Sequence, residues 1–213
     1  MDAFLKYLVD QGDRLVEATI EHAGIVLIAV ALATIIGVTI GLLTYRTDAP
    51  RQMALRITGI FLTIPSFALF GLLVPFLGLG QRPAVVALVM YGLLPIVRNT
   101  IVGLRTVDPA VVESAQGMGM GRYRRLLRIE LPLAWPVVLT GVRVATLLLI
   151  GIAAIGAYIN GPGLGEPIFG ASIGSAAALN DVLSGTLGVI VLAILFDLVY
   201  VAVFKLTTPK GIR

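Results

Sequence analysis

The sequence predicts an all-α membrane protein with five transmembrane helices, its N-terminus outside and its C-terminus in the cytoplasm. Hydrophobic residues make up 58% of the 213 residues and charged residues only 13%, whereas a soluble domain carries about 25% charged residues. The apolar runs are long enough to cross a bilayer, which takes about 20 helical residues. Lysines and arginines are also distributed unevenly between these runs, and that asymmetry sets the orientation.

Five apolar runs are the expected crossings, and they cover residues 24–44, 57–79, 84–104, 136–158 and 182–204. Pro65 and Pro75 interrupt the second run. Membrane helices tolerate proline because neighbouring groups satisfy the freed backbone atoms. We therefore expect one transmembrane domain over residues 23–205 and a cytoplasmic tail over 206–213.

The N-terminal segment, residues 1–22, is predicted to be an amphipathic helix on the outer membrane surface. It is acidic, whereas a secretory signal begins with basic residues. Phe4, Leu8 and Leu15 recur at near-helical spacing, a pattern typical of a helix that lies in the membrane interface.

The orientation follows from the positive charges. With the N-terminus outside, 13 of the 16 lysines and arginines fall on one side, and only Lys6, Arg14 and Arg82 fall on the other. Positively charged loops remain in the cytoplasm, so the long loop over residues 105–133 is cytoplasmic. The net charge of +4 is thus a consequence of topology, and no nucleic-acid partner is needed to explain it.

The composition excludes several kinds of site. The chain has no cysteine and a single histidine, His22, which excludes disulfides and a multi-histidine metal site. His22 is expected at the membrane boundary without a special role. The run Gly161-Pro-Gly-Leu-Gly165 lacks the Lys-Ser/Thr of a phosphate-binding loop, so we expect a turn or gate there. The rest of the sequence has no phosphate-binding loop motif either. We therefore expect neither a catalytic residue nor a bound cofactor in this chain.

The loop over residues 105–133 carries the most specific local signal. Asp108 is a good N-cap, and Pro109 suits the first helical position because the N–H it lacks would be unpaired there. A short helix is therefore expected over residues 109–116. It should end in the glycine run Gly117, Gly119 and Gly121.

The same loop resembles the EAA loop of ABC importer permeases. The matching residues are Glu113, Ser114, Ala115, Gly119, Ile129, Leu131 and Pro132, with Ser114 in place of the more usual alanine. The resemblance implies the type I ABC importer permease fold. It also implies that the loop forms a coupling helix, which sits in a groove of a cytoplasmic ATPase.

Further segments are similar to permeases of the osmoprotectant subfamily. They are Thr63 to Ser66, Tyr91 to Asn99 and Val107 to Ala110, within a resemblance that runs from about residue 24 to 205. This similarity implies a permease in the bacterial cytoplasmic (inner) membrane that imports glycine betaine, choline, carnitine or a related compound. It also implies three partners: an ATPase dimer that binds ATP and Mg, a second permease copy or paralogue, and an extracytoplasmic solute-binding protein.

Seven residues are candidates for the translocation path or its gate: Pro65, Ser66, Phe67, Phe70, Tyr91, Asn99 and Asp197. Aromatic faces attract quaternary ammonium groups, but aromatic residues in a helical bundle more often pack. Asn99 lies beside Arg98, and either gating or snorkelling to the headgroups would suit the pair. For Asp197, an ion pair with Arg143 or Arg98, or a contact with water, competes with a role in attracting a cationic solute.

Other functions stay open on the sequence alone. Within the ABC class, methionine or another small solute is the main alternative. A secondary transporter would usually show intramembrane charges or inverted repeats, and an intramembrane enzyme would need a nucleophile–base or metal constellation. A scaffold subunit would not need the spacing from Glu113 to Pro132.

Overall fold

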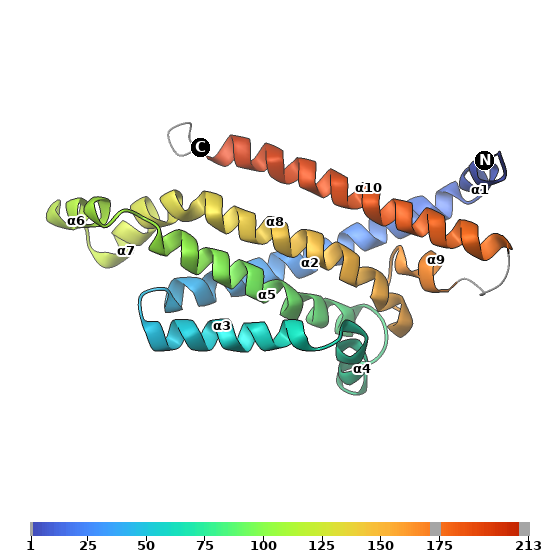
Figure 1. Cartoon of the computed structure of the whole chain (residues 1–213), viewed down its shortest axis with the longest axis horizontal. Coiled ribbons are helices and arrows are strands. Elements are labelled where there is room, and N and C mark those ends of the chain that lie inside the picture. The colour runs from blue at the N-terminus through green and yellow to red at the C-terminus, as the bar shows by residue number, and fades with distance from the viewer. Residues whose placement is uncertain (1, 171–175, 209–213) are drawn as a thin grey trace.

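The computed structural model describes residues 2–170 and 176–208, and every element in these two ranges is helical (Figure 1). The helices are α1 (Asp2–Asp10), α2 (Gly12–Thr44), α3 (Asp48–Thr63), α4 (Ser66–Leu77), α5 (Gln81–Arg105), α6 (Pro109–Gly117), α7 (Arg122–Arg125), α8 (Leu131–Ile155), α9 (Gly165–Phe169) and α10 (Ala176–Thr207). A π-helical turn (Leu126–Glu130) joins α7 to α8, and a 3-10 turn (Gly156–Ile159) follows α8. Most of the expected tail, residues 209–213, lies outside the described residues.

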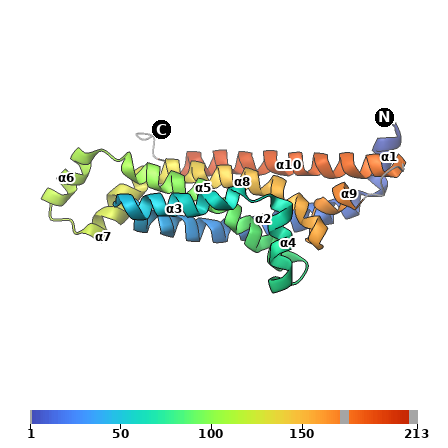
Figure 2. The same cartoon turned by 60° about the horizontal axis from the view of Figure 1, so that its bottom comes forward.

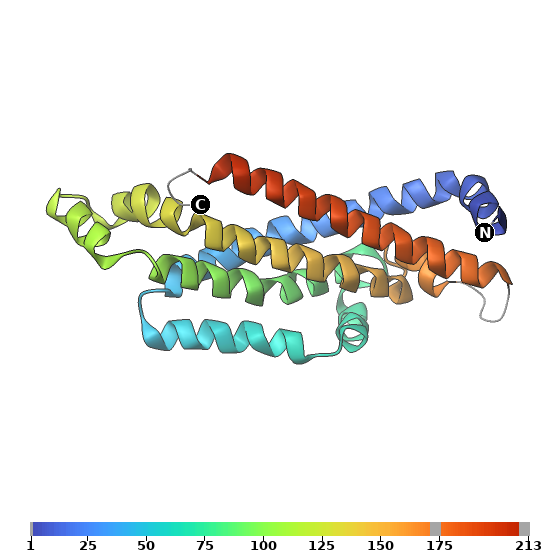
Figure 3. The same cartoon turned by 45° about the horizontal axis from the view of Figure 1, so that its top comes forward.

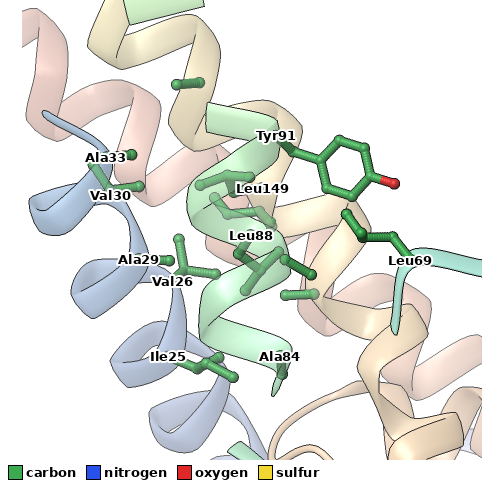
Figure 4. Close-up of a cluster of buried hydrophobic side chains, with 14 of the residues drawn as sticks. Ile25, Val26, Ala29, Val30, Ala33, Leu69, Ala84, Leu88, Tyr91 and Leu149 are labelled. Atoms are coloured by element: carbon green, nitrogen blue, oxygen red, sulfur yellow. The ribbon is translucent and has the colours of Figure 1, made fainter. Parts of the chain in front are cut away.

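The core forms where α5 packs against both α2 and α8. Figure 4 shows Val26, Ala29 and Ala33 along one face of α2, with Leu88 of α5 and Leu149 of α8 beside them. The three α2 residues follow the helical repeat, so one stripe of the helix is buried while the rest stays free to face lipid. Small residues on this stripe let the helix backbones come close together.

Glycines extend this close packing toward the other end of α2. A Cβ at Gly37 would lie 2.9 Å from the Ile96 side chain, and one at Gly41 would lie 2.5 Å from the Thr100 side chain. Both distances are too short for a real carbon contact, so only glycine permits this approach of α2 to α5. Interfaces between membrane helices are rich in small residues for the same reason.

The second apolar run, expected over residues 57–79 with interruptions at Pro65 and Pro75, is a bent pair of helices. The chain leaves α3 at Ile64 in an extended conformation, and α4 begins at Ser66 after a bend of 97°. Pro65 explains the break, because a proline disfavours the helical conformation of the preceding residue. In the described part of the chain, four helices are long and apolar enough to cross a membrane, or up to five if the bent pair is one crossing.

The N-terminal segment also differs from the prediction of one surface helix over residues 1–22. The helix breaks at Gln11, and residues 12–22 continue directly into the first apolar run as part of α2. Helical hydrogen bonding therefore extends the first apolar run at its N-terminal end. Only α1 forms a separate helix, and it packs against α2 and α10.

The last helix, α10, runs along the outside of the bundle (Figure 3). In its most apolar stretch only 6% of the residues are buried within the chain. A soluble protein could not leave so much apolar surface uncovered, so this helix needs lipid or another chain as its environment. The segment around α6 and α7 projects from one end of the bundle, while α1 and α9 lie at the other (Figure 2).

Candidate functional site

The helix expected in the long loop is present as α6, from Pro109 to Gly117, and its start is capped as predicted. The Asp108 carboxylate accepts a hydrogen bond from the backbone N–H of Ala110 at 2.8 Å, and Pro109 occupies the first turn. Ser114, the departure from the usual alanine, donates its hydroxyl to the Ala110 carbonyl at 2.7 Å. The serine is therefore accommodated within the helix.

The other end of α6 is closed by a Schellman motif. Gly119 has a φ of +77°, a conformation that other residues adopt only with strain. Its N–H donates to the Gln116 carbonyl at 2.9 Å, and the N–H of Met120 donates to the Ala115 carbonyl at 3.1 Å, which is the bond pair of this motif. Since α6 is capped at both ends, it is a stiff, well-defined element rather than a loose loop.

The motif residues divide into exposed and packed positions. Glu113 and Ser114 are exposed, while Ala115 is buried against the rest of the segment. Ile129 and Leu131 are half-buried where the π-helical turn meets α8, and Pro132 is exposed in the first turn of α8. These packed positions support the segment, and the exposed face of α6 is available to a partner.

A buried carboxylate that sequence reasoning missed organises the base of the segment. Glu130 is 3% exposed and accepts hydrogen bonds from Tyr45 at 2.7 Å, Arg46 at 3.0 Å and Arg125 at 2.9 Å. Arg125 also donates to Gln116 at 3.3 Å. This chain of bonds connects α6 through Glu130 to the end of α2.

The charge of Glu130 is maintained by its neighbours. Glu130 lies before the apolar run of α8, outside the expected crossing. Burial alone would raise the pKa of this carboxyl, but the hydrogen bonds from Tyr45 and Arg125 and the charges of Arg46 and Arg125 lower it below its ordinary value of 4.5. The carboxylate is thus ionised at neutral pH. The only sequence clue was a single acidic residue among basic ones, next to Ile129 and Leu131.

The aromatic candidates for the path fall into two groups. Phe70 and Tyr91 are buried among this chain's own core residues, and the Tyr91 hydroxyl donates to the Ile64 carbonyl at 2.7 Å. Their rings are therefore covered within this subunit, and their role in the path stays a prediction. Phe67 is exposed and contacts the ring of Tyr158, so it remains a candidate.

The polar candidates lie at bends and close contacts. Pro65 and Ser66 form the corner between α3 and α4. Asn99 donates to the Pro95 carbonyl at 2.8 Å and packs where Gly141 of α8 leaves room for it. Arg98 is exposed. None of these positions has a function that the geometry alone assigns, so their role in the path stays a prediction.

Asp197 forms the ion pair that was one of its two predicted roles. Arg143 donates from Nε to Oδ1 at 2.6 Å and from Nη2 to Oδ2 at 2.8 Å, a two-point contact between α8 and α10. Arg143 also lines a cavity of about 480 Å³, together with Tyr200 and Phe204. A pair with this geometry helps to fix α10 against α8, together with the hydrogen bonds Thr146–Tyr200 and Trp135–Thr207.

The prediction that His22 has no special role was wrong. His22 is fully buried; its Nδ1 accepts the N–H of Leu164 at 3.2 Å, and its Nε2 lies 3.0 Å from the Ile150 carbonyl. This arrangement requires a proton on Nε2. His22 therefore fastens the glycine-rich run at 161–165 to α2 and α8. Gly163, with a φ of +111°, passes so close that a Cβ would lie 2.8 Å from the histidine.

Comparison with known proteins places these features in a class. Residues 26–209 match the family described as the binding-protein-dependent transport system inner membrane component, and the chain belongs to that family. It is therefore a multi-pass protein of the bacterial inner membrane and a permease subunit, not itself the ATPase.

Two relatives are similar over nearly their whole length. A glycine betaine/carnitine/choline transport system permease protein, OpuCB of Bacillus subtilis, is 36% identical over 100% of this chain and 97% of its own length. The osmoprotectant import permease protein OsmW of Salmonella typhimurium is 39% identical over 98% of this chain and 99% of its own. The similarity thus includes the first 22 residues, where we expected none.

The fold also has a counterpart among solved structures. The MetNI methionine ABC transporter, in an inward-facing conformation, contains a chain that matches with a TM-score of 0.82, covering 92% of this chain and 96% of its own. The two are only 21% identical. The match thus identifies a shared permease fold and does not bear on the solute.

Proposed function

We propose that this chain is the permease subunit of an ATP-driven importer for a quaternary ammonium osmoprotectant such as glycine betaine, choline or carnitine. The observation that carries the coupling part is α6, a helix capped at both ends that projects from one end of the bundle (Figure 2). The solute class rests on the relatives whose names describe glycine betaine, carnitine and choline transport.

The proposed topology has five crossings, with the N-terminus outside and the C-terminus in the cytoplasm. The bent pair of α3 and α4 counts as one crossing, with α2, α5, α8 and α10 as the other four. This places α6 on the side that receives 13 of the 16 positive residues, as expected for a cytoplasmic surface. The end of α10 lies toward the same side as α6 (Figure 1).

The proposed mechanism uses α6 as the contact with a cytoplasmic ATPase. Two permeases, identical or paralogous, enclose the path, and each presents Glu113 to Gly119 to one ATPase subunit. ATP and Mg bind to that partner, and closure of the ATPase pair displaces α6. Because Glu130 connects this segment to the end of α2, the displacement reaches the bundle. An extracytoplasmic binding protein delivers the solute at the opposite end.

Uptake by the reconstituted transporter tests this proposal. The complex is purified with its ATPase and binding protein, placed in proteoliposomes and given radiolabelled glycine betaine, choline, carnitine or methionine, with and without ATP. We expect ATP-dependent accumulation of at least one quaternary ammonium solute. Accumulation of methionine alone would discard the solute class, and uptake without the ATPase would refute coupling through α6.

A further inference from the structure

Three aromatic side chains gather at the end of the bundle opposite α6. Phe67 at the start of α4 contacts Tyr158 with ring centres 5.1 Å apart, and Tyr158 contacts Phe169 of α9 at 5.0 Å. The residues are 61%, 56% and 41% exposed, respectively. Side chains from three separate elements thus form one cluster, and each ring keeps part of its surface uncovered.

The rings border two neighbouring cavities. One, of about 410 Å³, is lined by Phe67, Ile155, Tyr158 and Phe169. The other, of about 390 Å³, is lined by Tyr158 and Phe169 again, together with polar groups that include Asn160 and Glu166. Tyr158 and Phe169 therefore stand between the two spaces. Each volume lies in the range of small-molecule sites, about 300–1,000 Å³.

The chemistry of this lining favours a cation over an acyl chain. Exposed aromatic faces attract quaternary ammonium groups through the ring quadrupole. On the second cavity, the Glu166 carboxylate is paired with Arg14 at 2.6 Å, so the aromatic faces supply the attraction for a cation and Glu166 contributes a polar rim. Both this carboxylate and the Asn160 side chain are exposed. A lipid tail would gain nothing from such polar groups at the rim.

We infer that Phe67, Tyr158 and Phe169 form a weak outer binding site for the quaternary ammonium group of the solute, occupied after release from the binding protein. This inference rests on the proposed function for its solute class and its orientation. The affinity of the site for the cation is expected to be low, because each exposed cation–π contact contributes a factor of only roughly 2 to 5 in affinity. A weak site suits a path, since the solute must also leave it.

Cysteine labelling of the assembled transporter tests the site directly. The chain has no cysteine, so Ala157→Cys places a single thiol of this chain on the second cavity. A membrane-impermeant maleimide is added from the outside, with choline or with its neutral carbon isostere 3,3-dimethylbutanol. Val9→Cys, on the exposed face of α1, is the matched control that should label regardless of solute.

We expect choline to slow labelling of Ala157→Cys severalfold and the neutral isostere to leave it unchanged. The protection should persist with Tyr158→Phe, which keeps the ring, and should be lost with Tyr158→Leu, which does not. Equal protection by both compounds would overturn the inference, because it would indicate an apolar pocket without a preference for charge. Labelling of Val9→Cys alone would also overturn it, since a second subunit would then cover the cavity.

The uptake assay in the same proteoliposomes separates this inference from the proposed function. Quaternary ammonium uptake without choline protection would refute the outer site and leave the importer intact. Choline protection without ATP-dependent uptake would refute the importer and leave a cation site.

Discussion

Replacement of Glu130 by glutamine tests how the segment over residues 106–130 is held against the bundle. The substitution keeps the shape of the side chain, removes its charge and replaces one of the two oxygens that accept hydrogen bonds from Tyr45, Arg46 and Arg125 at 2.7, 3.0 and 2.9 Å. The two arginines then lie next to a neutral amide, whose NH₂ group opposes their own donors. We expect both lower stability and weaker coupling of ATP hydrolysis to uptake.

The size of the effect follows from burial. Removing one partner of a buried ion pair costs about 3–5 kcal/mol. The side chains of Arg46 and Arg125 are 27% and 12% exposed, so both can recover some solvation, and we take the lower figure of about 3 kcal/mol. For a chain of 150–250 residues this corresponds to a fall in melting temperature of roughly 6–12 °C.

The assay is thermal unfolding of the purified transporter in detergent, with Glu17→Gln as the control at an exposed glutamate of α2. Tyr45→Phe, which removes only the hydroxyl donor, should fall between the two. Because the folded pKa of Glu130 is lowered from 4.5, its stabilisation is fully present above that pH and is lost as the pH falls through the folded value. A melting temperature of Glu130→Gln equal to that of Glu17→Gln at pH 7 would refute the reasoning.

Three further predictions concern other contacts. Gly119→Trp should retain ATP hydrolysis but lose solute uptake, because a bulky residue at a φ of +77° disrupts the end of the coupling helix; unchanged uptake would exclude α6 as the coupling element. Asp197→Asn should loosen α10 by roughly 1 kcal/mol, since its pair with Arg143 is only partly buried, and equal stability and uptake would remove both roles proposed for this carboxylate. Gly163→Ala should lower the melting temperature by several degrees, because its Cβ would lie 2.8 Å from His22 at a strained φ.

The glycine substitutions have natural controls in the same chain. Gly117 and Gly151 both lie in helices, and a Cβ at either would meet no atom within 4 Å. Alanine at these positions should therefore be neutral or slightly stabilising. A loss of stability in Gly151→Ala as large as that in Gly163→Ala would show that the contact with His22 is not the cause.

Local rules explain which parts of the fold could be predicted. The start of α6 follows from Asp108 and Pro109, and its end follows from Gly119, because caps depend on residues within a few positions. Hydropathy likewise located the long apolar helices. Pro65 marked the position of the break between α3 and α4, but hydropathy could not give its angle of 97°, since an apolar run keeps the same composition whether or not the chain changes direction.

The contacts that were missed join residues far apart in the sequence. Glu130 meets Tyr45 across 85 positions, and His22 meets Ile150 across 128. Neither residue has a local pattern that indicates its partner, so His22 was expected to have no special role and Glu130 was not singled out. Asp197 was predicted more successfully, because a carboxylate inside a crossing needs a positive partner and the expected topology offered few of them.

The two ends of the segment over residues 106–130 are attached to α5 and α8, which also pack against each other. α5 runs into α6 through only three residues, 106–108, while α7 and the π-helical turn continue into α8 without a break. The segment is therefore anchored at both ends, to α5 and to α8, and the hydrogen bonds of Glu130 with Tyr45 and Arg46 connect it to the end of α2 as well. Because of these attachments, a force on α6 is transmitted to α5, α8 and α2 together. Under the proposed function with two permeases around the path, displacement of α6 would therefore move α5, α8 and α2 together, and the path would open where the two permeases meet.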